Sequence, residues 1–187
     1  MVSFRQQLQH STASLHKALE QTALLKIMAA GTPTRQQYRQ YLSAQLALIA
    51  PLEAQLRLWE SADWSALRLV KSEWLLADLK ALGCDEPLLA ADVPSISSPA
   101  QALGVQYVLE GSTLGLMLLK KRLNPEDHDL AQASRFISVY GQKTPNNWQV
   151  FVERLDRIAV ESRPEAENAA CAVFSAYLKQ FSTVDIL

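Results

Sequence analysis

The chain has 187 residues, of which 49% are hydrophobic and 20% charged, and its formal net charge at pH 7 is −1. This length is enough for one domain with a sizeable core, which we expect to span residues 1–187. The balanced charge excludes a global electrostatic attraction to nucleic acid or to anionic membranes.

Helical periodicity dominates the N-terminal half of the sequence. Apolar side chains recur at three- and four-residue steps over 3–29, and this helix is expected to stop at Gly31. A second helix is predicted over 34–58, with a kink at Pro51 because proline removes a helical hydrogen bond. A third helix is predicted over 64–82, followed by a loop over 84–98 that two prolines interrupt.

The C-terminal half is also predicted to be helical. Pro99 is suited to the first position of a long helix. Prolines and glycines then divide the remaining sequence, and the helices expected there span 99–123, 126–140, 145–160 and 164–181. The sequence has no alternating strand pattern, repeat or long linker, so it predicts an all-α, single-domain bundle of about seven helices.

The helix predicted over 99–123 contains an unusual pair of glycines. In the run GVQYVLEGSTLGLMLL, Gly111 and Gly115 are four residues apart and therefore share one face of the helix. Each glycine costs about 1 kcal/mol relative to alanine in a helix interior. Two explanations remain open: tight packing against another helix, or close approach of a flat ligand to the backbone with local bending.

The three histidines differ in their surroundings. His10 and His16 are six residues apart and point to different faces of one helix, so they cannot form a metal-binding pair. His128 lies in the acidic turn PEDHD and is expected to be solvated. His16, between Leu15 and Leu19, is either a histidine at the edge of the core or a single axial ligand to heme iron, because a macrocycle supplies the other ligands.

Other motifs are absent or uninformative. The sequence contains no nucleotide-binding glycine motif, nucleophile elbow or HExxH pattern. Cys84 and Cys171 are far apart and are expected to be reduced thiols. With no apolar signal core and no membrane-spanning run, we expect a cytoplasmic protein. The basic run KKR at 120–122 either complements the helix dipole or docks an acidic redox partner.

Four segments, in order along the chain, together resemble the bacterial heme oxygenase family, most closely its bacteriophytochrome-associated type. LHKALE is similar to the proximal helix of that family, and GTPTRQQYRQYL with the later PLE is similar to its second helix. ALGVQYVLEGSTLGL resembles the distal-helix signature, which is the most specific of the four. FISVYGQKTPNNWQVF resembles a later stretch of the family, which has the pattern FxxxYGxxTxxxWxxF.

The resemblance implies a fold, a reaction and a set of site residues. The expected activity is oxidative cleavage of heme, which serves as both substrate and cofactor, to biliverdin, CO and ferrous iron. The reaction uses O₂ and electrons from an external donor of the ferredoxin or flavodoxin type. His16 is implied as the axial iron ligand, with Glu20 one turn further on. The distal wall and macrocycle contacts are implied to involve Gly111, Ser112, Gly115, Leu116 and Phe174.

The sequence also departs from the family pattern. Leu116 replaces a second glycine or other small residue, and it either points away from the heme or crowds the O₂ site. The positions that hold the two heme propionates correspond to Gln9, Gln106, Gln149 and Glu153, none of which is cationic. The cations that could substitute for them in a rotated heme are Arg5, Lys17, Arg154 and Arg157.

These departures leave two alternatives to the enzyme. One is a heme or tetrapyrrole binder on the same fold without turnover. The other is a helical scaffold for a protein partner, in which the glycines serve only packing. A supply of biliverdin to a bacteriophytochrome is the pathway that the resemblance suggests.

Overall fold

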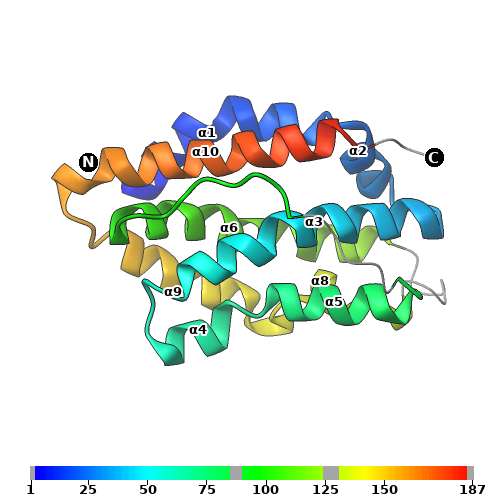
Figure 1. The fold of residues 1–187 in the computed structure, drawn as a ribbon. Helices are drawn as coiled ribbons and strands as arrows, with labels where there is room; N and C mark the ends of the chain where they lie inside the picture. Colours follow the sequence, from blue (N-terminus) through cyan, green and yellow to red (C-terminus); the bar gives the residue numbers. More distant parts are fainter. Residues whose placement is uncertain (1–2, 85–89, 124–130, 185–187) are drawn as a thin grey trace.

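The fold is a bundle of helices, shown by a computed structural model that describes residues 3–84, 90–123 and 131–184 (Figure 1). All regular elements in these ranges are helical, which confirms the all-α prediction. The α-helices are α1 Phe4–Glu20, α2 Ala23–Ala30, α3 Arg35–Leu56, α4 Ala62–Arg68, α5 Lys71–Ala81, α6 Pro99–Arg122, α8 Arg135–Ser138, α9 Thr144–Leu155 and α10 Arg163–Ser182. Two 3₁₀ turns, η1 Gly141–Lys143 and η2 Val160–Ser162, precede α9 and α10.

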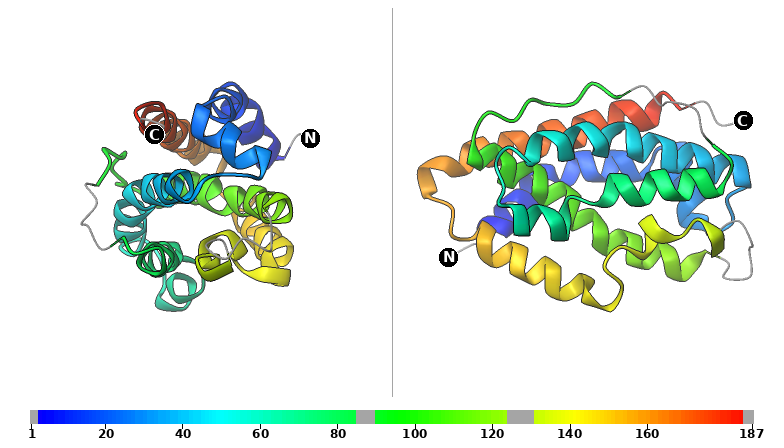
Figure 2. Two further views of the ribbon diagram at one scale, coloured as in Figure 1. Left: turned by 90° about the vertical axis from the view of Figure 1, so that its right-hand side faces the viewer. Right: turned by 60° about the horizontal axis from the view of Figure 1, so that its bottom comes forward.

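The helices form three tiers around one hydrophobic core. In Figure 1 and in the left view of Figure 2, α1, α2 and α10 form the upper tier and α3 and α6 the middle one, while α4, α5, α8 and α9 lie below. Helix α10 packs extensively on both α6 and α1. Helices α1 and α6 therefore share α10 as a common support.

Two of the predicted helices are interrupted in the structure. The predictions of one continuous helix over 3–29 and of another over 64–82 are therefore wrong, because each range contains two helices. The first breaks at Thr22, whose backbone is extended and whose hydroxyl donates to the Leu19 carbonyl at 2.8 Å. The second breaks between α4 and α5 at Leu69 and Val70. Competition from a threonine side chain is a recognised cause of a break like that at Thr22.

The C-terminal predictions hold in part. Pro99 is the first residue of α6, and α10 agrees closely with the helix predicted over 164–181. The helix predicted over 126–140 is wrong within the described residues, where the chain is helical only at 131–132 and in α8. The helix predicted over 145–160 ends early, at Leu155.

Buried carboxylates from distant helices cap two of the short ones. Glu53 of α3 accepts hydrogen bonds from the backbone N–H groups of Lys71 and Ser72, which begin α5. Asp78 of α5 accepts from the backbone N–H groups of Arg135 and Phe136 at the start of α8. Burial raises the pKa of Asp78, although these hydrogen bonds and the charge of Arg135 act in the opposite direction. These caps satisfy helix N-termini that lack local partners.

Helix α6 runs through the middle of the bundle. It is the one described helix whose length and composition would suffice to cross a membrane, with a mean hydropathy of 1.3 over its most apolar window. Half of that window is buried inside the bundle, as expected for a core helix. Its contacts with α10 and α9 account for this burial.

Candidate functional site

His16 stands on the outer face of α1 next to a carboxylate and an aromatic ring. Its side chain is 57% exposed, and its Nδ1 atom lies 3.5 Å from Oε1 of Glu20, one helical turn away. The imidazole meets the ring of Phe174 from α10 edge-on, with 5.6 Å between ring centroids. The structure thus brings together three of the predicted site residues. Pairing at Nδ1 orients the ring and directs Nε2 away from Glu20.

Of the three glycines of α6, Gly111 and Gly115 do not serve tight helix packing. A Cβ atom built on Gly115 would meet nothing within 4 Å, and one built on Gly111 would make only an ordinary contact, at 3.6 Å, with the Trp148 ring. Gly104 is different, because a Cβ there would collide with the Ala166 backbone of α10. Gly104 is therefore the packing glycine of α6, whereas Gly111 and Gly115 leave a strip of accessible backbone.

Ser112 and Leu116 point in different directions from this strip. Ser112 is exposed, and its hydroxyl donates to the Leu109 carbonyl at 2.8 Å. Leu116 is only 5% exposed and belongs to the hydrophobic core. The Leu116 side chain faces the core and not the exposed surface around Gly115. The leucine therefore leaves the exposed face at Gly115 open.

Sequence inspection missed an aromatic pair beside the glycines. Tyr107, one turn before Gly111, has its ring centroid 6.0 Å from that of Trp148. The Trp148 ring in turn lies beside the position that a Cβ atom on Gly111 would take. Burial raises the pKa of the Tyr107 phenol, although a hydrogen bond with the Thr12 side chain and the charge of Arg5 act in the opposite direction. Tyr107 therefore links α6 to α1. The spacing of residues 107, 111 and 115, four apart, is the signal that could have revealed it.

Several residues that the sequence placed near the heme propionates are engaged elsewhere. Gln106 is 1% exposed, accepts a hydrogen bond from the Trp64 indole and donates to Glu60. Arg154 forms two hydrogen bonds with the same Glu60 and stacks on Trp64. Gln149 and Glu153 are exposed neighbours on α9. Gln106 and Arg154 therefore brace α4 against α6 and α9, so both have protein partners.

Other potential sites contribute nothing to this one. One surface hollow is lined mainly by α3 residues with Cys84, and another by residues of α1 and α10 that include His10. Neither contains His16 or the glycines. No cluster of three metal-ligating side chains occurs in the part of the chain that the structure describes. His128 lies outside the described residues.

The arrangement suits a planar ligand with a metal centre. One helix carries an accessible imidazole with an orienting carboxylate, and a second helix carries a strip of backbone without side chains. Imidazole is a common iron ligand, and glycine allows the closest approach of a flat ligand to the backbone. An iron porphyrin requires one protein ligand on the proximal side and space for a small molecule on the distal side.

Comparison with known proteins agrees with this interpretation. The sequence model of the heme oxygenase family matches residues 2–183. A heme oxygenase of Xanthomonas campestris pv. campestris (strain 8004) is 31% identical over 146 residues, which is 75% of this chain and 86% of that protein.

Solved structures of heme oxygenases have the same fold. The enzyme of Neisseria meningitidis superposes with a TM-score of 0.75 at 21% identity, covering 97% of this chain and 91% of that one. The enzyme of Leptospira interrogans also gives 0.75, at 20% identity, with coverages of 98% and 100%. The Synechocystis heme oxygenase-1, solved in complex with heme, gives 0.69 at 13% identity, with coverages of 96% and 91%.

Proposed function

This chain belongs to the heme oxygenase family, and we propose that it binds its heme substrate between α1 and α6, with His16 as the axial ligand of the iron. The reaction of the family is the O₂-dependent cleavage of heme to biliverdin, CO and ferrous iron. Bound heme supplies the redox chemistry. The tasks left to the chain are to hold the iron, orient the macrocycle and keep a space open for O₂.

One observation carries the proposal: Gly111 and Gly115 leave backbone accessible where packing does not require it. A scaffold protein would gain about 1 kcal/mol per position by replacing such glycines with alanine. The alternative of a helical scaffold therefore has no explanation for them. A distal wall without side chains explains them, because it admits a flat ligand and a small gas molecule. Ser112, exposed beside the wall, would bond to ordered water there.

The position of Leu116 bears on whether the protein turns over its heme. A leucine directed into the distal space would hinder O₂ binding and would favour a non-catalytic heme binder. Leu116 instead packs in the core. The wall available to O₂ then consists of Gly111, Ser112 and Gly115, as in an active enzyme.

We place the heme propionates near Arg5 and Tyr107. These two residues are close enough for the arginine charge to affect the phenol, and together they offer a cation and a hydrogen-bond donor to a carboxylate. Phe174, which contacts His16, would pack against the proximal face of the heme, on the same side as His16. This seating would make up for the missing cations at Gln9 and Gln149.

We further propose that an acidic ferredoxin or flavodoxin supplies electrons in the cytoplasm. The exposed residues Lys120, Lys121 and Arg122 at the C-terminus of α6 are the proposed docking site, because long-range attraction accelerates such encounters. Reversing the charge with Lys121→Glu should slow donor-dependent turnover at low salt and leave ascorbate-driven turnover unchanged. Delivery of biliverdin to a bacteriophytochrome is the corresponding proposal for the product.

The axial ligand is tested by titrating apoprotein with hemin. The wild type should give a sharp Soret band of a histidine-ligated heme, and His16→Ala should lose it. His10→Ala is the matched control, since His10 is an exposed histidine of the same helix. Exogenous imidazole should restore the band in His16→Ala. An unchanged Soret band in His16→Ala would overturn the assignment.

A further inference from the structure

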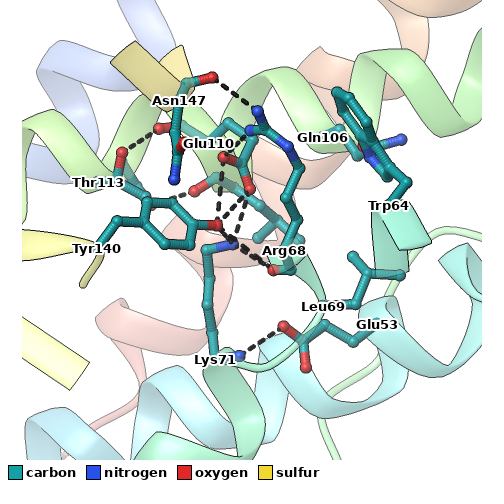
Figure 3. Close-up of polar contacts among 12 residues, drawn as sticks. Glu53, Trp64, Arg68, Leu69, Lys71, Gln106, Glu110, Thr113, Tyr140 and Asn147 are labelled. Atoms are coloured by element: carbon teal, nitrogen blue, oxygen red, sulfur yellow. Dashed lines mark hydrogen bonds and ion pairs between the residues drawn. The ribbon is translucent and has the colours of Figure 1, made fainter. Parts of the chain in front are cut away.

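A buried ionic cluster lies directly behind the distal wall. It consists of Arg68, Lys71, Glu110 and Tyr140, shown in Figure 3. Arg68 and Lys71 each donate to a different carboxylate oxygen of Glu110 at 2.8 Å. The Tyr140 hydroxyl lies 3.0 Å from Oε1 of Glu110 and 2.9 Å from Nζ of Lys71. The three charged residues are each exposed by 4% or less.

Stability alone does not account for such a cluster. Burying three charges carries a large desolvation penalty, and well-packed apolar side chains of similar volume are often at least as stabilising. A buried ionic cluster in which every charge is hydrogen-bonded does fix the relative positions of the segments that carry it, because all of its hydrogen bonds can form together in only one arrangement. Its members come from three separate parts of the chain, namely the α4–α5 junction with Arg68 and Lys71, Glu110 of α6, and Tyr140. The cluster therefore fixes the positions of these three parts relative to one another.

The backbone beside the cluster is strained. Val139 has φ 39° and ψ −125°, and it is the one described residue other than glycine with positive φ. Such a conformation is costly for a β-branched residue and persists only where the surroundings enforce it. The strained residue immediately precedes Tyr140. The backbone is thus strained next to the residue whose hydroxyl hydrogen-bonds to Glu110 and Lys71.

The cluster is attached to both components of the distal wall. Glu110 immediately precedes Gly111 in α6. Arg68 also donates to the backbone carbonyl of Asn147 at 2.9 Å, and Asn147 immediately precedes Trp148. The Trp148 ring in turn borders Gly111, because it lies 3.6 Å from the position that a Cβ atom on Gly111 would take. One set of bonds therefore holds the glycine strip and the aromatic side chain that borders it.

We propose that the Arg68–Lys71–Glu110–Tyr140 cluster is a positioning site that sets the distance and orientation of the distal backbone relative to the heme. This inference rests on the proposed heme site. Tyr140 is the positioning residue best suited to a test, because its ring is separately held by an edge-on contact with Trp74 at 5.7 Å. Removing only the hydroxyl should loosen the distal wall and leave the ring packed.

The test compares Tyr140→Phe with Tyr38→Phe. Tyr38 is the matched control, since its buried hydroxyl also donates a hydrogen bond, to the Ala133 carbonyl, but is not a member of the cluster. In the ferrous CO complex, the C–O stretching band should shift and broaden in Tyr140→Phe only. In the apoprotein, amide hydrogen exchange over 109–116 should accelerate in Tyr140→Phe only. The kcat should fall about 10-fold, less than a displacement of a full ångström can cause, with heme affinity unchanged.

A second variant keeps the test decisive if Tyr140→Phe folds poorly. Arg68→Lys retains the positive charge but is too short to reach both Glu110 and Asn147, and it should shift the same C–O band. If both cluster variants match Tyr38→Phe in band position and exchange rate, the cluster is only structural and the inference is wrong. If instead wild-type protein shows no His16-dependent Soret band, the proposed heme site fails, which is a separate outcome.

Discussion

His16 on α1 meets Phe174 on α10 edge-on, with 5.6 Å between ring centroids, and this contact joins the predicted axial ligand to the helix that supports both walls of the site. Phe174 is itself 7% exposed, and the imidazole is one of the groups that cover it. The proposed proximal side is thus held by contacts between protein side chains. The proposed distal side, in contrast, is open at Gly115.

Replacement of the two kinds of glycine should have opposite effects on folding. Gly115→Ala should raise the free energy of unfolding by up to about 1 kcal/mol, because a methyl group fits there and alanine favours the helix. It should nevertheless reduce heme turnover, since the methyl group stands on the distal wall. Gly104→Ala should lower the free energy of unfolding through its collision with Ala166. Thermal unfolding of the apoproteins and turnover assays measure both effects, and a Gly115→Ala enzyme with full activity would contradict the assigned wall.

Leu116 is expected to matter for stability and not for O₂ access. Leu116→Ala should lower the free energy of unfolding by about 2–5 kcal/mol, the range for a buried leucine. Its turnover per folded molecule should equal that of the wild type. Denaturant unfolding and single-turnover rates check the two statements separately. A gain in turnover on shortening this side chain would mean that Leu116 obstructs the distal space.

Arg5 and Tyr107 should control how the heme is seated. Arg5→Ala combined with Tyr107→Phe should weaken heme binding and change the proportions of the biliverdin isomers, because the meso carbon that is attacked depends on the in-plane orientation of the macrocycle. Arg35→Ala is the control, since Arg35 is an exposed arginine on α3 and not one of the proposed propionate partners. Hemin titration and chromatographic separation of the biliverdin isomers are the measurements. An isomer pattern identical to that of the wild type would argue against this propionate site.

Alkaline pH should unfold the protein through its buried tyrosines. Burial raises the pKa of Tyr140 to about 12, with the Lys71 charge opposing the effect, and raises the pKa values of Tyr38, Tyr41 and Tyr177 further. A pKa that is higher in the folded state means that the stabilising contribution is complete below pH 10, the usual tyrosine value, and is lost as pH rises toward the folded-state value. Tyrosinate absorbance should therefore increase together with loss of helical circular dichroism. Tyrosinate formation well before unfolding would contradict this.

The sequence predicted the long helices that local signals define. Pro99 begins α6 as expected, and the serine before it accepts the capping hydrogen bond from Gln101. Periodicity could not place the break between α4 and α5, because the cap of α5 is Glu53, which lies 18 residues away in the sequence. The same reason explains the failure at α8, which Asp78 caps from a distance of 58 residues at Phe136. Tertiary caps leave no local pattern.

The candidate site was predictable to the extent that it depends on residue types. A histidine followed by Glu20, and glycines four residues apart, are visible in the printed sequence. The direction of the Leu116 side chain was not predictable from the sequence. Neighbouring residues of a helix point about 100° apart, so whether Leu116 faces the core or the open side depends on how α6 packs against the other helices. Nor could the sequence distinguish Gly104, which packing requires, from Gly115, which it does not.

The central claim is that this chain cleaves a heme whose iron is bound by His16. An aerobic absorption time course of hemin-loaded protein with a reductant tests it most directly. The wild type should lose its Soret band and gain a broad red biliverdin band, with release of CO. His10→Ala should do the same, and His16→Ala should not. A wild-type Soret band that survives reduction in air, without biliverdin or CO, would contradict the account.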